Sequence, residues 1–302
     1  DFANSFYNRF VWSRIIYMKE VFNNALNELN NNEEFVVASV VRTSGSTPQK
    51  PGSKLLVKKD GTTIGTLGGG CVEGDIWFAS KEILSNGGSA KYQDYVLNED
   101  LAANDGLVCG GTMYFLIDPY RKEKSDLNNH LLSELDKAYK GELSLVLATI
   151  INSKNEEMIG QKLILKDNGD LMGDISDESL IKSISKEAPE LMNFGTCKTI
   201  ENEEVQIFLE GITTDPVVLI AGGGHVGKAI APLAIASGFK VWVADDREEF
   251  ANKDRFPEAE KIVNDKFDTA FDDLPIRKNT FIVIATRGHN FDDLVLENAA
   301  KT

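Results

Sequence analysis

Hydrophobic residues along the chain follow two patterns that predict two kinds of unit. Between about residues 33 and 211, short apolar runs such as 34–41 are separated by turns rich in Gly, Asn and Asp, as in strands joined by tight hairpins. From residue 216 onward, the run 217–221 is apolar throughout, as expected of a strand buried on both faces of a parallel sheet. A length of 302 residues also favours two domains.

The first pattern occurs twice. Residues 34–41 resemble residues 143–151, and residues 54–65 align with residues 162–173, including a Lys-Leu start and an Asp-Gly or Asn-Gly turn. A helix-like run and a closing strand follow in each copy, at 72–84 and 113–118 and again at 177–185 and 204–210. Two ordinary hairpins that happen to look alike are the alternative. We predict an internally duplicated, β-rich α+β domain with copies at about 33–119 and 142–211.

Glycine clusters distinguish the first copy from the second. The segment GSTPQKPG is followed by a strand and then by GTLGGGCVEGD, and CGG precedes the closing strand. Glycine lets the backbone adopt positive φ angles and approach a ligand closely. A linker is the alternative, but a strand before and a helix after the turn favour a ligand site. The predicted binding residues are Gly68, Gly69, Gly70, Gly110 and Gly111.

Cys71 and Cys109 each lie beside these glycines. A thiolate is a soft metal ligand and a nucleophile, so both cysteines are candidate metal ligands or nucleophiles. The alternative is that they are small core residues. Cys197 has no glycine neighbour cluster and is predicted to be structural. The chain contains neither a CxxC motif nor Cys/His zinc spacing, which argues against structural zinc.

A dinucleotide-binding unit is predicted in the second half of the chain. Residues 222–227 read GGGHVG and lie between the strand 217–221 and a helix-like run. Gly222, Gly224 and Gly227 are therefore expected to contact a pyrophosphate at the helix N-terminus. His225 could hydrogen-bond the same ligand or pack under the edge of the sheet. Asp245 ends the next strand and is placed for a ribose hydroxyl, whereas Arg247 could meet a 2′-phosphate. The choice between NAD and NADP stays open.

A later strand, 281–285, ends in the residues Thr-Arg-Gly-His. Open α/β sheets bind ligands at the carboxyl ends of their strands. Arg287 and His289 are therefore predicted to contact substrate or phosphate. Together, the two halves predict a Rossmann-like parallel-sheet domain at 213–302 and the duplicated domain at 18–212.

Composition and charge argue against several classes of protein. The hydrophobic share of 42% and the charged share of 26% are typical of globular proteins. A net charge of -15 argues against nucleic-acid partners. No apolar run is long enough to insert into a membrane. Three scattered cysteines argue against a disulfide framework and favour a cytoplasmic location.

The two ends of the chain lack clear signals. Residues 1–17 show no clean periodicity and are interpreted as an extraneous or disordered leader. Met18 begins an amphipathic helix and is the predicted natural start. The last residues form a helix-like run without a stop signal, so the C-terminal domain is predicted to be truncated.

These motifs, taken together and in order, resemble the xanthine dehydrogenase accessory-factor family. The resemblance is carried by GSTPQKPGSK with GTLGGGCVEGD, by CGGTMYFLIDP, and by AGGGHVG with VADDREEF and TRGH. It implies a chaperone that binds the molybdenum cofactor, as molybdopterin or its dinucleotide form, and assists its sulfuration and its insertion into xanthine dehydrogenase-type molybdenum hydroxylases. It implies that Cys71 and Cys109 are candidates for handling sulfur or molybdenum. It also implies such a hydroxylase as client and allows a cysteine desulfurase as a second partner. A homo-oligomer is left open.

Two other classes of function remain. One is an NAD(P)-dependent oxidoreductase that uses Cys71 or Cys109 together with His289 as catalytic residues. The other is a nucleotide-binding redox sensor without chemistry of its own. The chain lacks an iron–sulfur cysteine set and has no room for a flavin domain, so it is not predicted to be a xanthine dehydrogenase itself.

Overall fold

The computed structural model describes residues 18, 20–97, 110–277 and 279–301. These residues form two compact units, of which the first ends at Thr214 and the second begins at Asp215. The first unit is α+β with antiparallel sheets, and the second is built on a parallel sheet, as the sequence predicted.

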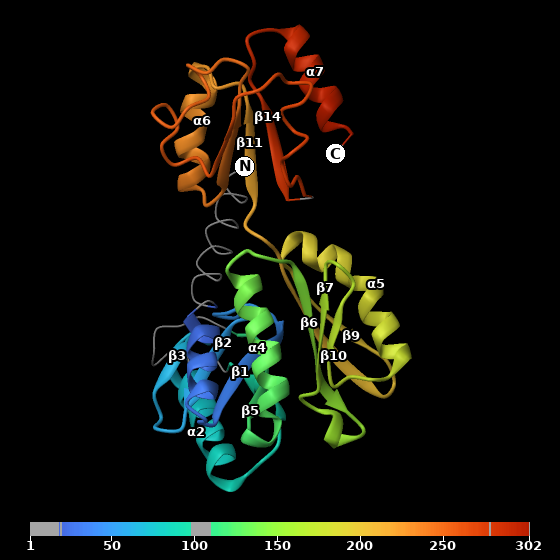
Figure 1. Cartoon of the computed structure of the whole chain (residues 1–302). Helices are drawn as coiled ribbons and strands as arrows, with labels where there is room; N and C mark the ends of the chain where they lie inside the picture. The colour runs from blue at the N-terminus through green and yellow to red at the C-terminus, as the bar shows by residue number, and fades with distance from the viewer. Residues whose placement is uncertain (1–17, 19, 98–109, 278, 302) are drawn as a thin grey trace. The chain divides into compact units, whose positions relative to one another are not determined.

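The first unit contains two five-stranded sheets with the same strand order, β3-β2-β1-β5-β4 and β8-β7-β6-β10-β9 (Figure 1). The first copy consists of a helix at 20–30, β1 (Phe35–Ser44), β2 (Lys54–Lys58), β3 (Thr63–Gly65), α2 (Gly70–Asn86), β4 (Lys91–Val96) and β5 (Thr112–Tyr120). The second consists of α4 (Ser125–Tyr139), β6 (Leu145–Ser153), β7 (Lys162–Lys166), β8 (Leu171–Gly173), α5 (Glu178–Phe194), β9 (Cys197–Glu201) and β10 (Val205–Ile212). Short 3-10 turns lie at Lys122–Lys124 and Glu156–Met158.

The repeat is longer than the sequence suggested, because each copy also has a helix before its first strand. The buried positions 18, 21, 22, 25 and 29, at the start of and within the first of these helices, have buried equivalents at 128, 131, 132, 135 and 139 in the second, which also buries Glu134 and Ala138. The identical spacing shows that the two helices present the same face to the core. The edge strands β4 and β9 were also missed, because they are short and mostly polar.

Both faces of each central strand are covered. In β1, Val36, Ala38 and Val40 face the core beneath α2, whereas Phe35 and Val37 face a core shared by both copies. This alternation follows from the period of two along a strand. The shared core also holds the buried faces of the helix at 20–30 and of α4, and α5 covers the outer face of the second sheet.

Ion pairs join the two copies in a symmetric manner. Lys54 begins β2 and lies 2.6 Å from Glu210 of β10, and its counterpart Lys162 begins β7 and lies 2.5 Å from Asp118 of β5. All four side chains are buried. Each copy thus provides one cation and one anion to the other, as in an isologous two-fold interface.

Matching bulges lie beside these ion pairs. The pairing of β1 with β5 skips Val41, and the pairing of β6 with β10 skips Ile151. Both skipped side chains are buried in one small cluster with Leu116 and Phe208. A bulge turns the extra side chain away from its regular direction, and here it brings the two sheets into contact.

The second unit has four parallel strands in the order β13-β12-β11-β14. Its elements are β11 (Val217–Ala221), α6 (His225–Ala236), β12 (Lys240–Ala244), β13 (Lys261–Val263), β14 (Thr280–Ile284) and α7 (His289–Ala299). Helices α6 and α7 cover opposite faces of the sheet (Figure 1). The connections from β11 therefore diverge, which creates a switch point between β11 and β14 at the carboxyl edge.

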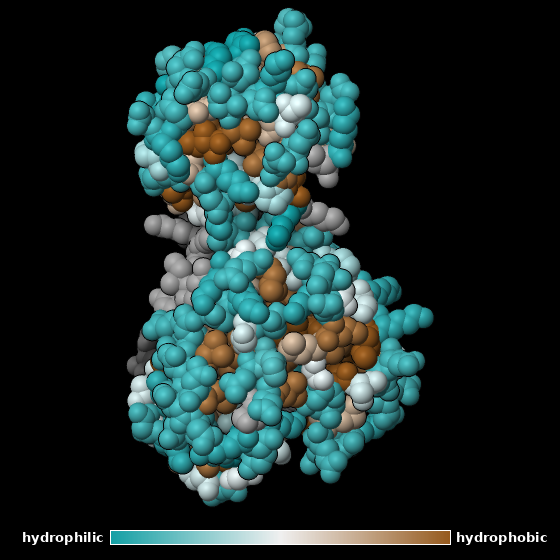
Figure 2. Space-filling model, viewed as in Figure 1, coloured by the Kyte–Doolittle hydropathy of each residue, from teal (hydrophilic) through white to brown (hydrophobic). Residues whose placement is uncertain are grey.

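The viewed surface is mostly hydrophilic, with separate hydrophobic patches on both units (Figure 2). Val226 and Leu233, which are 62% and 68% exposed, contribute apolar surface on α6. Among the described residues, no helix is both long and apolar enough to cross a membrane.

Candidate functional site

Three glycine-bearing segments of the first copy lie together. A Cβ atom on Gly111 would lie 2.5 Å from the carbonyl oxygens of Ser44 and Ser46, and one on Gly68 would lie 2.7 Å from the ring of Pro48. The GSTPQKPG loop therefore packs against both the three-glycine turn and the start of β5. Gly68 and Gly111 are glycines because neighbouring backbone and ring atoms leave no space for a side chain.

Gly69 has a different role in the same turn. Its φ is 77° and its ψ is -174°, a combination that is essentially restricted to glycine, and a Cβ there would have no neighbour within 4 Å. Gly68 and Gly70 also have positive φ angles, of 111° and 64°. The turn leads directly into α2, whose first residue, Gly70, is exposed.

Glu73, which the sequence reasoning missed, organises this turn. Its Oε1 accepts hydrogen bonds from Oγ1 of Thr66 at 2.6 Å, from the amide of Leu67 at 2.7 Å and from the amide of Gly69 at 2.9 Å. Burial favours the neutral carboxyl group and by itself would raise the pKa of Glu73. The hydrogen bonds to the charged carboxylate outweigh this effect, so the pKa of Glu73 is lowered. The glutamate in GGGCVEGD, in the first turn of a predicted helix, was a usable signal.

Cys71 is the second residue of α2 and is exposed. Tyr95 of β4 lies close to it: burial, a hydrogen bond with Asp75 and the proximity of Cys71 raise the pKa of Tyr95. Cys109 lies outside the described residues, so its predicted role beside Cys71 stays a prediction. Gly110 is exposed, whereas Gly111 is buried against the GSTPQKPG loop. Cys197 lies on β9 and packs against the small cluster between the sheets.

The corresponding turn of the second copy is closed by a side chain. Helices α2 and α5 are both 17 residues long and both end at a glycine in the left-handed conformation, Gly87 and Gly195. Asp177 caps α5 and accepts hydrogen bonds from the amides of Ser179 and Leu180. In α2 the equivalent position is Gly69, which has no side chain, and the Glu73 carboxylate accepts a hydrogen bond from the Gly69 amide instead. Gly70 and Cys71, the first residues of α2, are exposed, so this helix start stays open to a ligand although a carboxylate lies beside it.

The phosphate-loop glycines of the second unit have three different environments. Cβ atoms on Gly222 and Gly227 would lie 2.2 Å from the carbonyl oxygen of Ala285 and 2.1 Å from that of Gly222, and Gly222 has a φ of 115°. Gly222 makes the tight turn, and Gly227 allows α6 to pack closely on it. Gly224 has a φ of -60° and no atom within 4 Å of a Cβ, so it borders open space at the start of α6.

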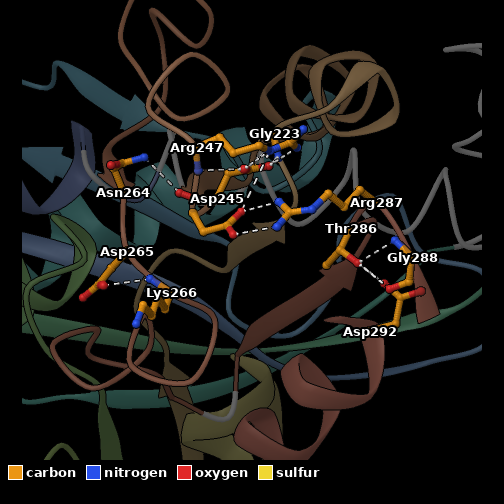
Figure 3. Close-up of polar contacts among 11 residues, drawn as sticks. Gly223, Asp245, Arg247, Asn264, Asp265, Lys266, Thr286, Arg287, Gly288 and Asp292 are labelled. Atoms are coloured by element: carbon orange, nitrogen blue, oxygen red, sulfur yellow. Dashed lines mark hydrogen bonds and ion pairs between the residues drawn. The ribbon is translucent and has the colours of Figure 1, made fainter. Parts of the chain in front are cut away.

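Asp245 is 1% exposed, and its carboxylate is already occupied (Figure 3). Oδ1 accepts from the amide and Nε of Arg247, and Oδ2 accepts from the amide of Gly223 and from Nη2 of Arg247, all at 2.8–3.1 Å. These four donors occupy about all of the hydrogen-bond acceptor sites that a carboxylate has. A ribose hydroxyl would have to displace Arg247 before it could bind Asp245 as predicted.

Arg255 also contacts the loop and was missed, because no motif includes it. Its Nε donates to the carbonyl of Gly223 at 2.6 Å, and its guanidinium carbon lies 5.1 Å from the ring centroid of Phe250. Its Nη2 is buried and has no hydrogen-bond partner among the described residues. A buried guanidinium nitrogen beside the phosphate loop matches an anionic ligand group.

An ion pair spans the carboxyl edge of the sheet. Nη1 and Nη2 of Arg287, in the loop after β14, lie 2.6 and 2.8 Å from the carboxylate oxygens of Asp246, which follows β12. Since β11 lies between these strands, the pair crosses the end of the strand that precedes the phosphate loop. His225 and His289 are the exposed first residues of α6 and α7. The predicted residues of this unit therefore gather at one edge.

Comparisons with known proteins give a family match in each of the two units. The model of the XdhC and CoxI family matches residues 29–95, which include the three-glycine turn, and the model of the XdhC Rossmann domain matches residues 218–302. The chain belongs to the XdhC and CoxI family. The second XdhC match contains the whole phosphate loop and confirms the Rossmann unit expected from GGGHVG.

Individual relatives of this XdhC-family chain come from three bacteria. A protein of Bacillus subtilis (strain 168), named as a probable subunit of xanthine dehydrogenase, is 26% identical over 279 residues, which are 89% of this chain and 76% of that protein. The uncharacterized protein YqeB of Escherichia coli (strain K12) is 32% identical over 91 residues, or 30% of this chain and 17% of that protein. A crystal structure from Bacillus halodurans, described as a xanthine dehydrogenase, has a TM-score of 0.58 at 22% identity and covers 91% of this chain and 77% of that one. This last similarity supports the fold.

Proposed function

We propose that this protein binds the molybdenum cofactor and assists its sulfuration and its insertion into xanthine dehydrogenase-type molybdenum hydroxylases. The observation that carries the proposal is the difference between the two copies at equivalent helix starts. Asp177 closes the start of α5, whereas the start of α2 has Gly69 at the equivalent position and presents the exposed Gly70 and Cys71. The name of the Bacillus subtilis relative supports a link to xanthine dehydrogenase.

The residues of both units fit such a cofactor chemically. The exposed first residues of α2 leave a ligand access to the helix start, and an exposed thiol can bind a soft metal or carry sulfur. Cys71 would hold the metal or its sulfur, with Cys109 as second candidate. The open space at Gly224 and the orphan nitrogen of Arg255 suit the pyrophosphate of a dinucleotide form. Among the described residues, no group of three or more His, Cys, Asp or Glu could hold a metal ion, so any metal would arrive with its organic ligand.

The proposal is tested by native purification from cells that make the cofactor. We expect molybdenum and pterin fluorescence to copurify with the wild-type chain and to be lost in Cys71→Ala and Cys109→Ala, with the thermal midpoint of each variant nearly unchanged. Cys197→Ala is the matched control and should retain the cofactor. Equal loading of all four proteins would contradict the proposal.

A second candidate function is an NAD(P)-dependent oxidoreductase or a nucleotide-binding redox sensor. The β11–α6 loop favours this alternative because its glycine geometry matches a dinucleotide site. Hydride transfer between NAD(P)H and a small substrate by the purified chain would support the oxidoreductase. Binding of the nucleotide without turnover and without copurified pterin would support the sensor.

A further inference from the structure

A cavity of about 440 Å³ lies between the two copies of the first unit, away from the glycine turn. Its wall combines the end of α2, the end of β5 and the start of α4 with the turn before β7 and with Asp174. The volume lies within the range of about 300–1,000 Å³ that is usual for small-molecule sites. The cavity lies at the opposite end of β5 from Gly111, so it is a separate site.

Asn128 of α4 lines this cavity and is only 6% exposed. Its carboxamide makes no hydrogen bond within the described part of the chain, and its polar atoms are not enclosed by protein, so they can bond to a molecule in the cavity. The equivalent position in the first copy is Met18, which is 3% exposed and packs in the apolar core. The second copy therefore has a polar group where the same fold is stable with an apolar one, and this group borders a cavity.

Charges around the cavity are unequal in number. Three ion pairs line it, Arg121–Glu34 at 3.3 Å, Lys124–Asp174 at 3.0 Å and Lys162–Asp118 at 2.5 Å. Glu123 and Glu157 also line it and form no ion pair with a described residue. Every lining cation is thus paired, and two carboxylates remain.

Unused acceptors reach the inner part of the cavity. Lys162 contacts Oδ2 of Asp118, and Oδ1 has no partner among the described residues. The Nζ of Lys162 also donates to the carbonyl of Gly160, which further limits its capacity for a ligand. Together with the carboxamide oxygen of Asn128, Asp118 therefore offers acceptors to a ligand that brings several N–H donors.

We propose that this cavity binds a small organic molecule with a guanidinium or amidinium head group. Such a planar cation presents paired N–H donors that match a carboxylate, and its charge offsets the surplus of Glu123 and Glu157. The described residues contain no cluster suited to a metal ion, so an organic cation fits this wall better. The site is independent of the cofactor proposed for the glycine turn.

Titration calorimetry on the full chain tests the proposal with L-arginine, agmatine and methylguanidine as probes. L-citrulline is the matched control ligand because a neutral urea group replaces the guanidinium. We expect saturable binding of the guanidinium probes and binding of citrulline that is at least about tenfold weaker.

Asn128→Met, which installs the residue of the first copy, is the decisive variant. It should weaken arginine binding at least about tenfold and leave the thermal midpoint unchanged or higher, because the first copy packs Met18 at the equivalent position. Glu82→Gln, at an exposed position of α2 outside the cavity, should bind arginine as the wild type does.

Several outcomes would overturn the assignment. They are no saturable binding of any guanidinium probe, equal binding of citrulline, unchanged binding by Asn128→Met, or preferential binding of inorganic phosphate at this cavity. A marked fall in the thermal midpoint of Asn128→Met would also overturn it, because it would show that the carboxamide has a structural partner.

Discussion

The four glycines of the β11–α6 segment show how one motif combines structural and binding roles. A Cβ added to Gly222, Gly223 or Gly227 would overlap with backbone atoms, at distances of 2.2, 1.9 and 2.1 Å. Gly224 faces open space. Substitutions at neighbouring positions of the loop should therefore have opposite consequences for stability and binding.

We predict that Gly224→Val weakens the binding of NAD(P) or of pterin dinucleotide by at least about tenfold, because the side chain would fill the space at the helix start. Its cost in stability should be about 1 kcal/mol, since φ is already suitable for a side chain. Gly227→Val is the control and should destabilise the fold by about 1–3 kcal/mol or more through overlap with Gly222. Calorimetry and thermal unfolding measure the two effects, and unchanged affinity of Gly224→Val would move the nucleotide elsewhere.

Glu73 makes the turn before α2 sensitive to acid. Its pKa is lowered from 4.5 in the folded state, so its contribution to the free energy of unfolding is present above the unfolded pKa and is lost as pH falls through the folded one. Glu73→Gln should therefore be less stable than the wild type at neutral pH, and the difference should shrink towards about pH 3. Urea unfolding at a series of pH values measures the difference in stability between the two proteins. A difference that does not change with pH would contradict the prediction.

Helices α2 and α5 have the same length and the same glycine ending, but they begin differently. In α5, Asp177 satisfies two amides of the first turn. In α2, the same position is Gly69 in a conformation restricted to glycine. The helix that carries the proposed site therefore lacks the stabilising cap of its counterpart and has exposed residues at its start, an arrangement that favours binding over stability.

Asp177→Ala should lower the free energy of unfolding by about 0.5–2 kcal/mol through loss of the cap. Glu190→Ala, on an exposed position of the same helix, should have almost no effect. Gly69→Ala should also destabilise, by about 1–3 kcal/mol, although its Cβ meets no atom, because its φ is 77°. Denaturant unfolding compares the three variants, and a neutral Gly69→Ala would show that the turn relaxes.

The first unit as a whole is a pair of copies joined by buried charges. Lys54–Glu210 and Lys162–Asp118 each connect one copy to the other. Burial works against the charged ammonium of Lys162, but the charge of Asp118 outweighs it and raises the pKa of this lysine. Breaking a buried pair leaves an uncompensated charge, so these pairs fix how the copies meet.

Lys54→Met should cost about 3–5 kcal/mol, because Glu210 would remain buried without its cation. The double variant Lys54→Met/Glu210→Leu should lose less than the sum of the single variants. A double-mutant cycle by denaturant unfolding measures this coupling. Additive losses would show that the pair does not act across the interface.

Periodicity and glycine placement in the sequence were sufficient to predict the duplicated α+β unit and the Rossmann unit. These features are local: a period of two or of 3.6 determines which side chains share a face, and a glycine turn between a strand and a helix predicts a binding loop. Gly224 and Cys71 were found in this way, and both lie at exposed or open positions.

The tertiary structure decided which side chains are available. Asp245 matches the motif for a ribose contact, yet Gly223 and Arg247 occupy its carboxylate. Lys54 and Glu210 are 156 residues apart in the chain but form one buried pair. Asn128 borders a cavity that exists only because the two copies meet there. The partners of a polar group come from segments distant in sequence, so local patterns predict the position of a side chain but not what it binds.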